Sequence, residues 1–200
     1  DALQGAADIL AEEVAERAES RAYLRDYFLR EAVFTSGIKA EDYPEGTTKF
    51  EMYRNYTAKV KDIAPHNLLA LLRGESEGIV TMNLEFDEAE VLAYLESKEI
   101  RTKVPEIRNF YRALVKDGFH RLMKNSLISE VRSLKKQEAD LESVKTFEAN
   151  LRELLLSPPA GMKPTIGIDP GFRTGCKVAV LDETGKFLEY QTIFPHQSQK

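Results

Sequence analysis

The sequence predicts a mainly α-helical scaffold with a small β element, followed by the first strands of an α/β domain. Apolar side chains recur at helical spacing over most of residues 1–156. A run rich in Pro and Gly, SPPAG, then separates this part from the remainder. From residue 165 onward, short β-branched and apolar runs alternate with glycine-containing turns. We therefore expect one domain at 1–157, a linker at 158–164 and a second domain at 165–200.

The N-terminal part is expected to begin with two helices. Residues 2–17 place their apolar side chains on one face, which is typical of an amphipathic helix. Ser20 is a suitable cap for a second helix. Gly37 would end that helix, because glycine readily adopts the backbone conformation found after a helix C-terminus.

The next stretch is predicted to hold a loop, a short helix and one clear strand. Residues 41–48 are polar and contain Pro and Gly, whereas residues 50–60 carry tyrosines at helical spacing. A short helix at 67–73 would stop at Gly74. Residues 78–86 alternate apolar and polar side chains, which indicates a strand.

The rest of the scaffold is expected to be helical. Asp87 would cap one helix and Pro105 would open another, since each residue type suits the first positions of a helix. Gly118 interrupts the apolar pattern and should separate two helices. The four helices expected here lie at 87–97, 105–117, 119–139 and 141–156.

The C-terminal residues predict three strands joined by a loop and a tight turn. The strands are expected at 166–169, 177–182 and 186–194, with a Gly-containing turn at 182–185. In the loop at 169–175, Pro170 keeps Asp169 extended, so that its carboxylate lies at the end of the first strand.

Charge is distributed unevenly along the chain. The net charge of -5 argues against a uniformly basic nucleic-acid-binding protein. Residues 1–97 carry 10 basic and 20 acidic side chains, whereas residues 98–136 carry 11 basic and 4 acidic ones. One basic island therefore lies in an acidic chain.

Other features of the composition narrow the class of protein. Cys176 is the single cysteine, which excludes an intrachain disulfide and suits a reducing cytoplasm. No apolar run approaches the length of a membrane span, and no signal peptide opens the chain. Because the sequence begins with Asp1 rather than Met, we expect it to be part of a longer protein.

The basic island contains a regular row of cations. Arg108, Arg112 and Lys116 are four residues apart, so on a helix they form a stripe with a spacing of about 6 Å that can follow a phosphate backbone. Arg121 and Lys124 continue the charge on the next helix. These five residues are our expected nucleic-acid contacts. The alternative is a solvated face whose cations pair with the acidic N-terminal helices.

Asp169 is the only candidate for a catalytic carboxylate. A carboxylate at the end of a first strand, followed by a hairpin, is how metal-dependent nucleases of the ribonuclease H type begin. Such sites need several carboxylates around two divalent ions, and the sequence offers one. We therefore predict no catalytic residue, no metal site and no cofactor in this stretch, and the alternative role for Asp169 is to cap the following turn.

The loop after Asp169 also resembles the phosphate loop of actin-like ATPases and sugar kinases. The bulky Phe172 is a poor residue for close phosphate contact, whereas Arg173 is suited to a nucleic-acid phosphate. The three histidines, His66, His120 and His196, are scattered and have no cysteine at zinc-ligand spacing.

Three segments together resemble a known family. The segment IGIDPGFRTGCKVAVLDETGKFLEYQTIFPH is similar to the start of the YqgF-type, ribonuclease H-like domain of the bacterial Tex proteins, which are transcription accessory proteins. PHNLLALLRGESEG and DALQGAADILAEEVAERAESRAYLR resemble parts of the Tex central helical region. The most specific part of the resemblance is the run at 169–175.

The resemblance implies a cytoplasmic, multidomain protein that binds nucleic acid, RNA or DNA, and works with the transcription machinery. It also implies an incomplete ribonuclease H-like domain here, of a type that is not reliably an active nuclease. The expected function is therefore a nucleic-acid-binding scaffold without catalysis in this piece. The alternatives are a metal-dependent nuclease or resolvase in the full-length protein, an actin-like phosphotransferase, and a scaffold that binds no nucleic acid.

Overall fold

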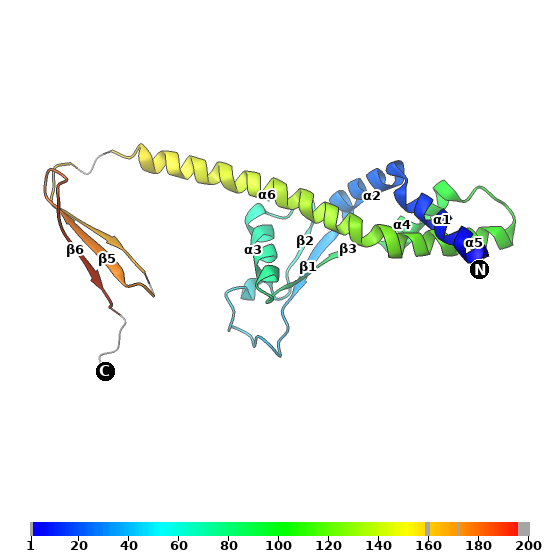
Figure 1. Ribbon diagram of the computed structural model, residues 1–200, viewed down its shortest axis with the longest axis horizontal. Coiled ribbons are helices and arrows are strands. Elements are labelled where there is room, and N and C mark those ends of the chain that lie inside the picture. Colours follow the sequence, from blue (N-terminus) through cyan, green and yellow to red (C-terminus); the bar gives the residue numbers. More distant parts are fainter. Residues whose placement is uncertain (1, 159–160, 172, 196–200) are drawn as a thin grey trace. The chain divides into compact units, whose positions relative to one another are not determined.

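A computed structural model describes residues 2–158, 161–171 and 173–195. The chain divides into two compact units, Asp1–Ala149 and Asn150–Lys200. Figure 1 shows the helices and strands of each unit. The predicted linker at 158–164 falls in the second unit, and its residues 159 and 160 lie outside the described part.

The first unit is mainly α-helical with one small sheet, as the sequence predicted. Its helices are α1 (Ala2–Glu16), α2 (Ala18–Glu31), α3 (Pro65–Ser76), α4 (Glu88–Glu99), α5 (Pro105–Gly118) and α6 (Lys124–Leu155), of which α6 extends past the boundary between the units. Its strands are β1 (Val33–Gly37), β2 (Thr57–Lys59) and β3 (Thr81–Glu85). In Figure 1, α3 lies beside these strands, and α1 lies beside α5.

The sheet of the first unit has the antiparallel order β2-β1-β3. The predicted helix from Ser20 to Gly37 is wrong at both ends, since α2 ends at Glu31 and β1 follows at once. Phe34 shows the reason, because it pairs with Ala58 on one side and Leu84 on the other. Ser20 is buried inside α2 and does not cap it. These long-range pairings override the local helical pattern.

Two further expectations are corrected in the same region. Residues 50–60 form a short 3-10 turn, Glu51–Tyr53, and then β2, instead of a helix. The helix α3 does not stop at Gly74 but runs through it. A Cβ atom at position 74 would stand 2.5 Å from Val80 Cγ2, so glycine is needed there for close packing and not for helix termination.

Helix α4, helix α5 and strand β3 are confirmed. The Asp87 carboxylate accepts a hydrogen bond of 3.1 Å from the Glu90 backbone N–H, which caps α4. Pro105 occupies the first turn of α5. Backbone N–H groups in the first turn of a helix have no acceptor within the helix, so the N–H that proline lacks costs no hydrogen bond there.

Helices α5 and α6 are joined by a π-helical turn, Phe119–Met123, and Gly118 does not break the helix as predicted. Beyond that turn, the helices expected at 119–139 and 141–156 form one continuous helix, α6. The fully buried hydrophobic residues of this stretch recur every four positions, at Val115, Phe119, Met123, Leu127 and Val131. In a regular α-helix such a repeat drifts by about 40° per step. The wider π turn absorbs part of the drift and keeps these side chains facing the core.

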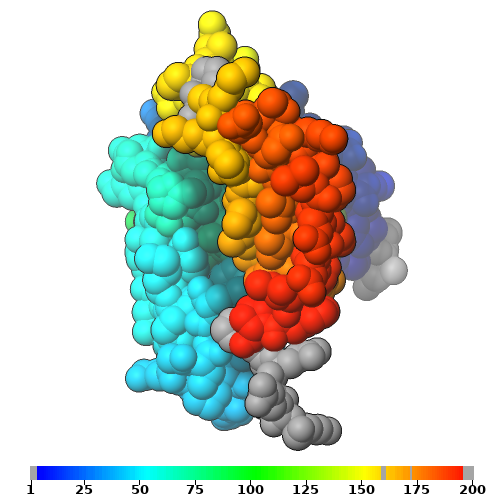
Figure 2. Space-filling view, turned by 90° about the vertical axis from the view of Figure 1, so that its left-hand side faces the viewer, coloured from blue at the N-terminus to red at the C-terminus, as the bar shows by residue number. Residues whose placement is uncertain are grey.

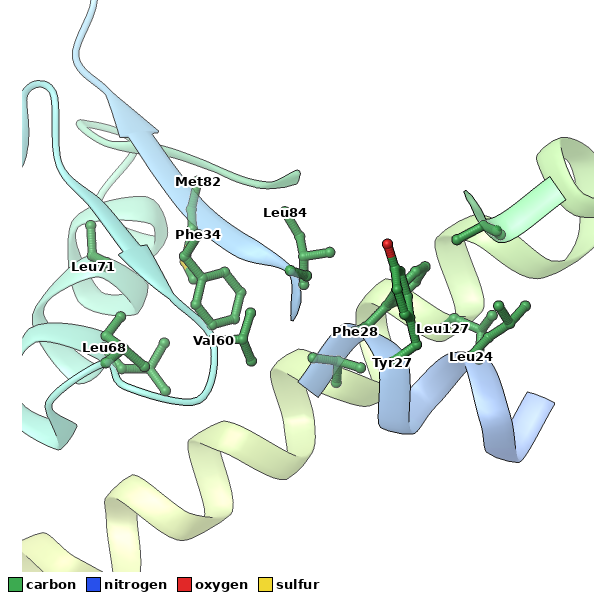
Figure 3. Packing of buried hydrophobic residues seen from close by; sticks show 14 of the residues in the cluster. Leu24, Tyr27, Phe28, Phe34, Val60, Leu68, Leu71, Met82, Leu84 and Leu127 are labelled. Atoms are coloured by element: carbon green, nitrogen blue, oxygen red, sulfur yellow. The ribbon is translucent and has the colours of Figure 1, made fainter. Parts of the chain in front are cut away.

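One hydrophobic cluster holds the sheet and most of the helices together (Figure 3). Phe34 of β1 and Leu71 of α3 are fully buried in it, as are Phe28 of α2 and Leu127 of α6. Each such side chain contributes about 1.5–3 kcal/mol through burial. A smaller cluster of Ala11, Val14 and Leu114 joins α1 to α5.

The second unit contains the three strands that the sequence predicted. They are β4 (Thr165–Asp169), β5 (Cys176–Leu181) and β6 (Phe187–Ile193), in the antiparallel order β4-β5-β6. They run side by side, orange to red, in Figure 2. Gly185, with φ of 82°, closes the turn between β5 and β6.

Candidate nucleic-acid interface

The cations of α5 lie on an exposed flank of the helix, beside its buried face. Leu114, Val115 and Gly118 are buried, and this packing fixes the rotation of the helix. Arg108, Arg112 and Lys116 are exposed and form a row beside this buried face. The structure therefore brings the three residues of the predicted stripe together on one surface of the first unit.

Among the described residues, only Arg112, in the middle of this stripe, has a carboxylate partner. Arg112 Nε lies 3.0 Å from Glu96 Oε2 of α4, in an ion pair that stays partly exposed. Within the described part of the chain, neither Arg108 nor Lys116 forms an ion pair. The ends of the stripe are thus available to an anionic ligand.

Arg121 belongs to a local acidic network. Its guanidinium lies 2.9 Å from Asp117 and 3.4 Å from Asp8 of α1. The hydrogen bond to the Asp117 carboxylate raises the pKa of Arg121 above its usual value, and Asp8 and Glu12 add to this effect. A phosphate at Arg121 would therefore compete with two carboxylates.

Lys124 is also engaged within the first unit. Its ammonium lies 3.3 Å from Glu88 Oε2 and 5.5 Å from the centre of the Phe86 ring. His120 Nε2 lies 3.2 Å from the other oxygen of Glu88. Of the five cations predicted on these two helices, Arg108 and Lys116 have the least competition from carboxylates.

Asp169 ends β4 in the second unit, as expected. Its carboxylate lies 3.9 Å from the ammonium of Lys177, the residue directly opposite on β5, and is 77% exposed. Both residues line a shallow cavity of about 330 Å³, together with Gly167, Ala179 and Tyr190. No group of three or more His, Cys, Asp or Glu side chains that could hold a metal ion occurs among residues 2–158, 161–171 and 173–195.

The two glycines after Asp169 serve the packing of the loop itself. A Cβ atom at position 171 would stand 2.6 Å from the Gly175 carbonyl oxygen, and Gly175 has φ of 78°. Arg173 is exposed in this loop. Phe172 and His196 lie outside the described residues.

The sequence reasoning missed a cavity between α1, α4 and α5. It has a volume of about 270 Å³, and its charged lining residues are Glu13, Arg17, Lys98, Glu99 and Arg101. Glu99 is the notable member, since its side chain is only 7% exposed. These residues come from segments about 80 positions apart in the printed sequence, so no local spacing connects them.

Comparison with known proteins places the chain in a family. Residues 1–147 match the model of the Tex central region, and residues 163–200 match that of the Tex protein YqgF-like domain. Protein YdcI of Bacillus subtilis is 36% identical over 197 residues, which cover 98% of this chain and 27% of that protein. The transcriptional accessory protein Tex of Neisseria gonorrhoeae is 35% identical over 201 residues, covering 98% of this chain and 26% of that protein.

A human protein is also similar. The S1 RNA-binding domain-containing protein 1 of Homo sapiens is 29% identical over 157 residues, which cover 76% of this chain and 16% of that protein. The chain spans about a quarter of the length of the two bacterial relatives. In the part of the chain that the structure describes, no helix has both the length and the apolar character needed to cross a membrane. The two family models together cover most of the sequence, and the chain belongs to the Tex family.

Proposed function

We propose that the chain is the scaffold part of a nucleic-acid-binding transcription accessory protein, and that α5 is its contact surface for a single strand. The observation that carries this proposal is the exposed row of Arg108, Arg112 and Lys116 on one side of α5. Membership of the Tex family supports it, as do the names of the gonococcal and human relatives.

The geometry of the row suits contact with a phosphate backbone. Residues four apart on a helix are separated by about 6 Å along its axis, so three cations present a short linear array of positive charge. Phosphate contacts of this kind give affinity without reading the sequence of bases. The role that follows is general strand binding.

The charge of the remaining chain directs a strand toward this surface. Residues 1–97 carry twice as many acidic as basic side chains, whereas residues 98–136 are strongly basic. A polyanion is repelled by the first segment and attracted by the second. Arg121 and Lys124, which already have carboxylate partners, would add weaker contacts.

In the second unit, we propose that Arg173 adds a phosphate contact and that Asp169 is not a catalytic residue of this stretch. Arg173 is exposed in the loop, and the Asp169 carboxylate already faces the Lys177 ammonium. Membership of the Tex family is what supports a binding role in the cytoplasm, beside the transcription machinery.

The test replaces the three cations of the stripe together. The variant Arg108→Ala, Arg112→Ala, Lys116→Ala should bind a single-stranded oligonucleotide more weakly, and its salt dependence should flatten by about 0.7 per lost phosphate contact. Fluorescence anisotropy at several salt concentrations measures both quantities.

A matched control separates the effect of the stripe on binding from the effect of net charge. The variant Arg30→Ala, Lys59→Ala, Lys61→Ala removes three exposed cations elsewhere in the first unit. It should keep the salt slope of the unmodified chain. If the two triple variants behave alike, or if neither changes the affinity, α5 is not the contact surface.

A further inference from the structure

An apolar ridge runs along the first turns of α5, beside the stripe of cations. It consists of Val104, Ile107 and Tyr111, whose spacing of three and four residues places them on one face of a helix. The same face continues into Leu114 and Val115, which are buried. By contrast, Val104 and Ile107 are 47% and 46% exposed, and Tyr111 is half-buried. The cover over this face therefore ends within α5 and leaves the ridge open to a ligand.

The inner end of the ridge meets the cavity between α1, α4 and α5. Tyr111 lines this cavity together with Leu10, Val14 and Arg101. In the described part of the chain, Arg101 forms no ion pair, and the same holds for Arg108 of the stripe. Arg108 precedes Tyr111 by three residues, so the two side chains are neighbours on the surface of α5. Two cations without carboxylate partners therefore lie near Tyr111, one in the cavity and one on the helix.

The cations and the ridge suit different parts of one ligand. Arg101 and Arg108 attract anions, whereas the ridge offers apolar surface with one aromatic ring. A nucleotide carries both kinds of group, since its phosphate is charged and its base presents a flat face to an aromatic side chain. An acidic peptide with apolar side chains also carries both. The regular row of three cations on α5 favours the nucleotide, because it matches a polymer that is charged at every unit.

We propose that a base of the bound strand stacks on Tyr111. Ile107 covers the adjoining base, and Arg101 and Arg108 contact the phosphates that flank the stacked one. Because every base has a flat π face, such a contact adds affinity without selecting a sequence. This inference rests on the proposed function, and it adds contacts with bases to the contacts with phosphates.

The first test compares two single strands on the unmodified chain. Both strands have the same length and the same number of phosphates, but one carries thymine at every position and the other carries abasic sugars. The thymine strand should bind about ten-fold more tightly, since stacking of one base on an aromatic side chain contributes about that factor. The salt slope should be the same for both strands, because it reports phosphate contacts alone. Fluorescence anisotropy at several salt concentrations measures both quantities.

The second test assigns the effect to the ring of Tyr111. Tyr111→Leu should lower the affinity for the thymine strand to nearly that for the abasic strand and should leave the salt slope unchanged. Tyr111→Phe, which keeps the ring, should retain the preference for thymine. The matched control is Tyr43→Leu, because Tyr43 is also half-buried in the first unit but belongs to the loop between β1 and β2. Circular dichroism and the melting temperature check the fold of all three variants.

The outcomes separate this inference from the proposed function. Equal affinity of the unmodified chain for the two strands would overturn the inference alone and leave the acidic peptide as the partner of the ridge. A preference for thymine that survives in a folded Tyr111→Leu chain, or that is lost in Tyr43→Leu as well, would also overturn it. If Tyr111→Leu does not fold, the strand comparison on the unmodified chain still decides. A chain that binds neither strand would overturn both proposals.

Discussion

Gly118 of α5 lies so close to Ala11 of α1 that a Cβ atom at position 118 would stand 3.1 Å from the Ala11 carbonyl oxygen. The contact is to backbone, so the neighbour cannot move aside by a side-chain rotation. We expect Gly118→Val to lower the free energy of unfolding by about 1–3 kcal/mol, because the branched side chain would force α1 away from α5.

Urea denaturation measures this change, and Gly5→Val serves as the control. Nothing lies within 4 Å of a Cβ atom built at Gly5, which is also helical. The control should leave the midpoint nearly unchanged. Equal midpoints for the two variants would show that the α1–α5 contact is looser than described.

Removing the acidic partner of Arg112 should strengthen nucleic-acid binding. Glu96 lies 3.0 Å from Arg112 and competes with any phosphate for that guanidinium. In Glu96→Gln, the affinity for a single-stranded oligonucleotide should rise, and the salt slope should steepen by about 0.7 as one further phosphate contact forms.

The control for this gain is Glu142→Gln, which removes an exposed carboxylate that is 3.9 Å from Lys145 on α6. It should raise the affinity much less, since it changes net charge without freeing a stripe cation. A Glu96→Gln variant with the affinity of the control would assign the gain to net charge alone.

Mg²⁺ or Mn²⁺ should neither bind at Asp169 nor support strand cleavage by these 200 residues. A divalent ion needs several oxygen ligands, whereas the Asp169 carboxylate faces the ammonium of Lys177 at 3.9 Å. Titration calorimetry and a gel assay with labelled single strands check both statements. Metal-dependent cleavage that disappears in Asp169→Asn would contradict the prediction and favour the nuclease alternative.

The turn between β5 and β6 should loosen in acid. The Asp182 carboxylate accepts hydrogen bonds from the Thr184 hydroxyl and from the Lys186 and Thr184 backbone N–H groups, which lower its pKa below 3.8. Because the folded pKa is depressed, this stabilisation is present above pH 3.8 and is lost as the pH falls through the folded value.

The amide resonances of Thr184 and Lys186 in a pH titration by NMR would report this loss. Asp182→Asn keeps an acceptor oxygen but cannot titrate, so the pH dependence should vanish in that variant. Amide shifts in the variant that still titrate below pH 3.8 would assign the effect to another group.

Local signals in the sequence were sufficient where the structure is decided locally. Asp87 and Pro105 marked the starts of α4 and α5, and alternation with a closing glycine at 185 marked the hairpin of β5 and β6. The same signals failed for β1, because Phe34 is held by partners on β2 and β3 that lie 24 and 50 positions away along the printed sequence.

The candidate nucleic-acid interface was also predictable from the sequence only in part. The four-residue spacing placed Arg108, Arg112 and Lys116 on one exposed face, because amphipathic packing fixes how α5 is rotated. The carboxylates that compete for Arg112 and Arg121 come from α4 and α1, which only the tertiary fold brings near. For the same reason, Glu99 carried no local signal of its unpaired oxygen.

The π-helical turn at Phe119–Met123 holds one residue more than an α-helical turn of similar rotation. Losing one residue from it would therefore leave a regular α-helix through the junction, and the side chains farther along α6 would change direction little. Leu127 and Val131 would keep their inward positions. The junction can thus absorb a deletion that, in the regular part of α6, would rotate every later side chain by about 100°.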